Sequence, residues 1–102
     1  MRKIIEMLKA VINPFFIADN GTSQYYILLT DTKDEIYKHM TTKPSAQNTF
    51  LNLIINQLDM CAACTDEKSA AIVFYWHAIT DYIRILTYMA EDAEAAERSA
   101  RK

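Results

Sequence analysis

Apolar residues near the start of the chain recur at helical spacing over residues 2–12, with Arg2, Glu6 and Lys9 on the opposite side. This pattern predicts a short amphipathic helix. Asn13 and Pro14 follow, and a residue before proline is pushed out of helical backbone conformation. We therefore expect the helix to end near residue 13.

The next segment, at about 15–29, fits two structures. Asn20-Gly21 between two apolar runs is typical of a two-residue hairpin turn, which would pair Phe16 with Tyr25. A helical stripe over residues 23–41 fits the same stretch, through Tyr26, Leu29, Ile36 and Met40. The pattern leaves a β-hairpin and a helix both open.

Polar residues predict where the later helices begin. Thr32 with Glu35 three residues on has the form of a capping box, which indicates a helix over 33–41. Pro44-Ser45 is typical of the start of a helix reaching about residue 63. Thr65 with two acids after it predicts the start of the last helix near residue 66.

The last helix is predicted to organise the fold, because its apolar residues repeat at steps of four and three: Ile72, Trp76, Ile79, Ile83, Leu86 and Ala90. Neighbouring apolar residues widen this stripe: Phe74, Tyr75, Tyr82, Ile85 and Met89. Beyond residue 90 the same positions carry charge. We expect residues 1–90 to form a single helical domain and 91–102 to project as a charged helical tail.

These elements predict a mainly α protein, a compact helical bundle built around a long C-terminal helix. The hairpin at 15–29, if formed, would make it α+β. A chain of 102 residues with 51% hydrophobic residues is the size of one domain with one core.

Charge and hydropathy indicate which kinds of partner to expect. A net charge of -2 makes nucleic acid an unlikely partner, since no broad positive field is present. The most apolar window, Ser69 to Thr80, is about half of a membrane span, and the N-terminus lacks a continuous apolar segment. We expect a cytoplasmic protein without membrane contact.

Cys61 and Cys64 form a C-x-x-C pair, which can be a redox dithiol or half of a zinc site. His77 and Asp81, or else His39, would have to complete the zinc site. Because Cys61 falls on the apolar side of its helix, we expect both cysteines to be buried, structural and reduced. No cofactor, metal or small-molecule substrate is expected, and His77, Asp81 and Arg84 fit an exposed polar strip better than an acid/base site.

Six tyrosines, four phenylalanines and one tryptophan exceed what a small core needs. The likeliest exposed, partner-binding residues are Tyr25, Tyr26, Tyr37 and Tyr88. We expect a non-enzymatic protein–protein interaction module, a small regulator or inhibitor that docks on a larger assembly and can self-associate as a homodimer. Phages and plasmids carry accessory proteins of this kind, although no residue here indicates such a source.

Two alternatives remain. A dimeric DNA-binding regulator would touch phosphates through Arg2, Lys3 and Lys9 or through Lys33, Lys38 and Lys43. A thiol-redox or zinc protein would use the two cysteines.

Overall fold

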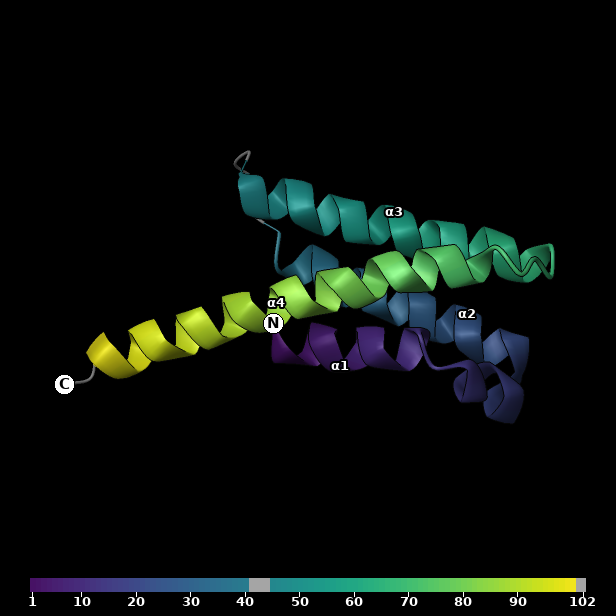
Figure 1. The fold of residues 1–102 in the computed structure, drawn as a ribbon, viewed down its shortest axis with the longest axis horizontal. Coiled ribbons are helices and arrows are strands. Elements are labelled where there is room, and N and C mark those ends of the chain that lie inside the picture. Colours follow the sequence, from purple (N-terminus) through teal and green to yellow (C-terminus); the bar gives the residue numbers. More distant parts are fainter. Residues whose placement is uncertain (41–44, 101–102) are drawn as a thin grey trace.

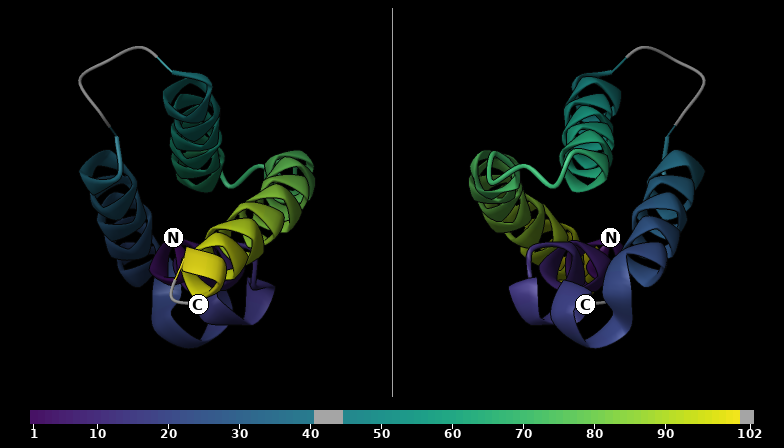
Figure 2. Two further views of the ribbon diagram at one scale, coloured as in Figure 1. Left: turned by 90° about the vertical axis from the view of Figure 1, so that its left-hand side faces the viewer. Right: turned by 90° about the vertical axis from the view of Figure 1, so that its right-hand side faces the viewer.

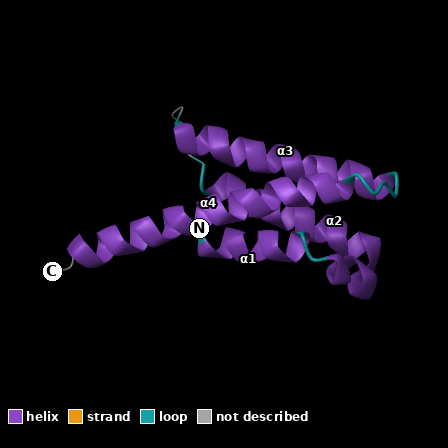
Figure 3. Cartoon of the chain, viewed as in Figure 1, coloured by secondary structure: helices purple, strands orange, loops and turns teal. Residues whose placement is uncertain are grey.

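The computed structural model describes residues 1–40 and 45–100, which hold four helices and no strand (Figures 1 and 3). The helices are α1 (Arg2–Val11), α2 (Pro14–Lys38), α3 (Ala46–Asp66) and α4 (Ile72–Ala100). The prediction of a mainly α protein is confirmed.

The break between α1 and α2 forms as the sequence predicts. The Asn13 side chain accepts a hydrogen bond from the Phe15 amide at 3.0 Å, and Pro14 occupies the first helical position, where its missing amide hydrogen costs nothing. The apolar row of α1 is buried: Ile4, Ile5, Leu8 and Val11.

The β-hairpin at 15–29 is wrong, because α2 runs through this segment with a kink at Gly21. A tight hairpin turn of the Asn-Gly type needs positive φ at both residues. Only Gly21 has one, with φ 78° and ψ 174°, whereas Asn20 keeps a negative φ. One glycine in this conformation kinks α2 and does not form a two-residue hairpin turn.

The capping box at Thr32 is also wrong. Thr32 lies inside α2, is fully buried, and its hydroxyl donates to the Leu28 carbonyl at 2.6 Å. Glu35 pairs with Lys3 and Lys38. The helix ends at Lys38, earlier than the sequence predicts.

Ser45 caps α3 as predicted, accepting from the Asn48 amide at 3.0 Å. Thr65 does not begin the last helix, because it lies in the final turn of α3 and donates to the Cys61 carbonyl. The chain reverses at Lys68, whose φ of 53° is left-handed, and the Ser69 amide donates to the Cys64 carbonyl at 2.8 Å. The last helix therefore starts at Ile72 instead of residue 66.

The helices form a four-membered ring in which α1 and α3 each pack against both α2 and α4 (Figure 2). α2 and α4 lie on opposite sides of this ring. The side chains that fill its centre are fully buried and come from all four helices, among them Ile4, Leu8, Tyr25, Ile36, Leu51, Ile54, Leu58, Ile79 and Leu86.

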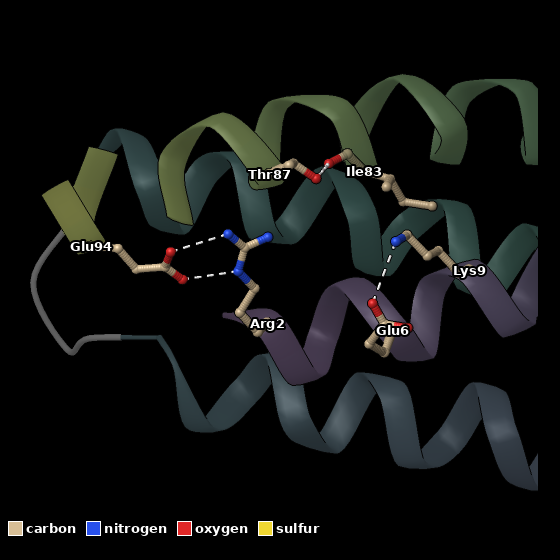
Figure 4. Close-up of polar contacts among 6 residues, drawn as sticks. All are labelled: Arg2, Glu6, Lys9, Ile83, Thr87 and Glu94. Carbon is tan, nitrogen blue, oxygen red and sulfur yellow. Dashed lines mark hydrogen bonds and ion pairs between the residues drawn. The ribbon is translucent and has the colours of Figure 1, made fainter. Parts of the chain in front are cut away.

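The end of α4 extends beyond the bundle (Figure 1), and every residue over 91–100 is exposed. The Arg2 guanidinium donates to both carboxylate oxygens of Glu94, at 2.9 and 3.2 Å, and so links this extension to α1 (Figure 4). Residues 101–102 of the predicted tail lie outside the described residues. That the tail is separable from the domain stays a prediction.

Gly21→Ala should lower the free energy of unfolding by about 1–3 kcal/mol, because the backbone region of Gly21 is essentially restricted to glycine. An added Cβ would meet no atom within 4 Å, so the cost is that of the backbone alone. Urea denaturation measures it. Ser23→Ala, on the exposed side of the same helix, should change stability by only a few tenths of a kcal/mol. Equal stability of the two variants would contradict the strain at Gly21.

Candidate functional site

Two hydrogen bonds in series, one buried and one partly buried, join three helices. The Tyr25 hydroxyl donates to the Val11 carbonyl at 2.9 Å, and the Trp76 indole N–H donates to the Tyr25 oxygen at 3.0 Å. Val11 ends α1, where a carbonyl has no partner within its own helix. The Tyr25 side chain is therefore a structural link, and burial raises the pKa of its hydroxyl.

The four tyrosines predicted to bind a partner occupy different environments. Tyr25 is fully buried, so its prediction as a surface residue is wrong. Tyr26 is half-buried, and its hydroxyl donates to the Asp66 carboxylate, which raises the pKa of Tyr26 to about 12. Tyr37 and Tyr88 are exposed. The structure places them on α2 and α4, which lie on opposite sides of the ring, and does not bring them together.

Both cysteines are buried and free. Burial raises the pKa of the Cys61 thiol to about 12, even though the nearby Tyr25 hydroxyl acts in the opposite direction. A thiol that keeps its proton at neutral pH is a poor nucleophile and a poor metal ligand. The expected structural role of Cys61 agrees with these features.

The proposed zinc ligands do not converge. His77 and Asp81 are exposed on α4, while the cysteines are buried in α3. His39 lies beside Glu35, with 3.8 Å between ring nitrogen and carboxylate oxygen. Among residues 1–40 and 45–100, no three His, Cys, Asp or Glu side chains are grouped as a metal site would require.

Positive side chains of the two basic clusters face carboxylates. Arg2 pairs with Glu94, Lys9 with Glu6, and Lys33 with Asp59, the last at 2.9 Å. Lys3 and Lys38 both approach the largely buried Glu35. Burial acts to raise the pKa of Glu35. The two ammonium groups act to lower it, and because their combined effect is larger, the pKa lies below its usual value. Lys43 lies outside the described residues.

Two hollows lie on the described part of the chain. One, of about 210 Å³, is mainly apolar and lies where the start of α2 approaches the turn between α3 and α4, lined by Ile17, Cys64 and Ile72. The other, of about 320 Å³, lies between α1 and α2 and is lined by Asp31, Asp34 and Glu35 with Lys3 and Lys38. Drug-sized ligands occupy pockets of about 300–1,000 Å³ lined mostly by apolar groups. Neither hollow combines that size with that lining.

The apolar surface of α3 and α4 is the stronger candidate. The rings of Phe50 and Tyr82 meet edge to face, with centroids 5.4 Å apart, which identifies the sides of the two helices that adjoin. On α4, Ala78, Ile85 and Met89 lie one or two turns from Tyr82 along the same side. Ile85 is 44% exposed.

Apolar side chains of α3 continue this surface. Leu53 lies one turn from Phe50, and Met60 two turns further along. They are 44% and 42% exposed, and Phe74, at the start of α4, is 77% exposed. We call this surface the α3–α4 face; it consists of Phe50, Leu53, Met60, Phe74, Tyr75, Ala78, Tyr82, Ile85 and Met89. None of these residues is charged, but Asp81 lies at the edge of the face, one turn from Ala78 and from Ile85.

The sequence gives a partial signal for this face. The apolar arcs of residues 50–61 and 72–90 are wider than one core needs, which predicts an uncovered strip. The periodicity alone, however, assigned Phe74 and Ile85 to the core-facing stripe. In the structure these two side chains lie on the outer side, because α1 and α2 cover only the inner sides of α3 and α4.

No helix within the described parts of the chain has both the length and the apolar content needed to cross a bilayer. Comparisons with protein-family models, curated proteins and solved structures find no match to this chain.

Tyr25→Phe should lower the free energy of unfolding by about 1–3 kcal/mol, because the Val11 carbonyl and the Trp76 indole N–H both lose their partner. Trp76, the single tryptophan, reports the transition by fluorescence in urea. Tyr88→Phe is the matched control, since its hydroxyl lies on an exposed side chain, and should be neutral. A neutral Tyr25→Phe would exclude the proposed link.

The free energy of unfolding should fall as pH rises from about 9 towards 12. Cys61 ionises with an ordinary pKa of 9.0 when unfolded and about 12 when folded, so the folded chain holds this proton more tightly. The contribution of this proton to stability is therefore complete below pH 9 and is lost progressively as the pH rises towards 12. Urea denaturation across this range should give a shallower fall for Cys61→Ala. A fall as steep as that of the wild type would show that other groups cause it.

Proposed function

We propose that this protein is a non-enzymatic interaction module that docks on another protein surface through the α3–α4 face. The observation that carries the proposal is the exposure of large apolar side chains on the adjoining sides of α3 and α4. Apolar side chains of two adjacent helices form this face, charge lies only at its edge, and several of these side chains are nearly half exposed or more. Soluble monomers seldom leave large contiguous apolar patches in water, and such patches commonly mark protein contacts.

The chemistry of the face fits a protein partner. Long flexible side chains such as Met60 and Met89 adapt to the shape of a partner, and aromatic side chains such as Phe74 supply large contact area. Tyr88, exposed beside Ile85 on α4, adds an amphipathic rim. Regulation or inhibition of a larger assembly is one use of such a module.

The electrostatics favour protein over nucleic acid. The described members of both basic clusters already pair with carboxylates, so binding to phosphates would have to break these ion pairs. Duplex DNA that bound with an affinity falling steeply with salt would transfer the proposal to the DNA-binding alternative.

Ile85→Lys should abolish partner binding while leaving the fold intact, because a charge on the face must be desolvated in a complex but remains in water when the protein is free. Ile27→Lys is a matched control: Ile27 is an isoleucine on α2, 52% exposed, away from the face. Complexes isolated from host cells, identified by mass spectrometry, should contain the same partner with wild type and Ile27→Lys only. Loss of the partner with both variants, or with neither, would contradict the assignment.

A further inference from the structure

We infer that the α3–α4 face is covered by a second copy of this chain, in a two-fold dimer whose α4 helices run antiparallel about Ile85. This inference rests on the proposed function and names the partner at the same surface. Its first support is area. At about 1.5 Å per residue, the α4 side of the face with its extension, from Phe74 to Ala96, is about 33 Å long, and the α3 side, from Phe50 to Met60, is about 15 Å long. Each helix is about 11 Å wide, so each copy offers about 530 Å² and two copies bury about 1,060 Å². Specific interfaces start at about 1,000 Å².

Charge also permits a second copy. A two-fold contact presses the same surface against itself, so any charge on it meets a like charge nearby. The residues of the face have none, the acids Asp81 and Asp92 lie at its edge, and the net charge of -2 leaves little long-range repulsion between copies. A partner selected by opposite charge would find no complementary group on this face.

The extension of α4 gives the alignment. The row of α4 that contains Tyr82, Ile85 and Met89 continues past the bundle as Ala93, Ala96 and Ala100, at steps of four and three residues. In the isolated chain this row has nothing to pack on, since residues 91–100 are all exposed. A partner that uses the whole row must be as long as α4, and an antiparallel α4 of a second copy has this length.

Pairing about Ile85 matches large side chains with small ones. Phe74 and Ala96 are both eleven residues from Ile85, so Phe74 of one chain comes level with Ala96 of the other. The extension of each chain thereby covers the most exposed phenylalanine of its partner. The acids at the edge of the row, Asp81 and Asp92, come level with Met89 and Ala78 of the other chain, so each acid is offset by about one helical turn from the nearer of these two acids in that chain.

Sedimentation equilibrium from 1 to 100 µM tests the dimer, with these concentrations chosen to span about micromolar affinity. Wild type and Ile27→Lys should be dimers. Ile85→Lys should raise the dimer Kd by at least about thirty-fold, as loss of a central contact does. Leu53→Lys on α3 is a second, independent variant with the same expectation. Helical content and melting of each variant verify that it folds. Unchanged dimers in both face variants would overturn the inference.

Two variants test the alignment. Ile85→Cys should form an intermolecular disulfide under mild oxidation, because its two copies meet at the two-fold axis, whereas Ile27→Cys should not. A chain ending at Ala90 should dimerise about ten-fold more weakly, since the alanine row is missing. No cross-link at residue 85, or full affinity without residues 91–102, would overturn this alignment.

The outcomes separate the inference from the proposed function. A wild-type chain that stays monomeric at 100 µM, yet loses a host partner in Ile85→Lys, would overturn the second copy and keep the docking face. A monomer that loses no partner in Ile85→Lys would overturn both.

Discussion

The arrangement of the helices depends on the two hydrogen bonds of the Tyr25 hydroxyl. This hydroxyl supplies a donor to the Val11 carbonyl, which the end of α1 leaves without a partner, and accepts the Trp76 indole N–H. Three helices thus meet at one buried oxygen. Dispersion and apolar burial favour many packings of four amphipathic helices, whereas a directional hydrogen bond in a low-dielectric interior favours one. The kink at Gly21 lies four residues earlier and separates the start of α2 from the part that carries Tyr25.

The unequal lengths of the helices explain the exposed face. α1 has 10 residues, whereas α3 has 21 and α4 has 29. Within residues 1–40 and 45–100, a ring closed by so short a helix buries the inner sides of α3 and α4, and no further element covers their outer sides. The apolar residues there do not add to the core of a single chain. Their exposure to water is unfavourable, and association would bury them. The proposed docking face follows from this geometry.

Much of the fold can be predicted from the sequence, because α1, the break at Asn13-Pro14 and the cap at Ser45 depend on local chemistry alone. The errors occur where a local signal has two uses. Thr32 and Thr65 can cap a helix, but inside one each donates to the carbonyl four residues earlier, at 2.6 and 2.8 Å. Asn20-Gly21 can turn a hairpin, yet Gly21 alone takes the left-handed conformation and only bends α2. Tertiary packing decides between these uses.

The candidate site was harder to predict than the fold, because periodicity assigns a residue to a side of a helix but not to a neighbour. Tyr25 and Tyr88 look equivalent in sequence, but one is buried at the centre and the other is 60% exposed. Phe74 and Ile85 similarly fall within the wide apolar arc of α4. Because α3 packs on one side of α4 and α1 on another, the outer edge of this arc stays at the surface. The width of an apolar arc thus predicts that a face exists, while the number of available neighbours determines which residues form it. Four helices in one ring leave each with two neighbours, so an arc of about 200° exceeds what they cover. The uncovered parts of the apolar arcs on α3 and α4 lie next to each other and form a single surface.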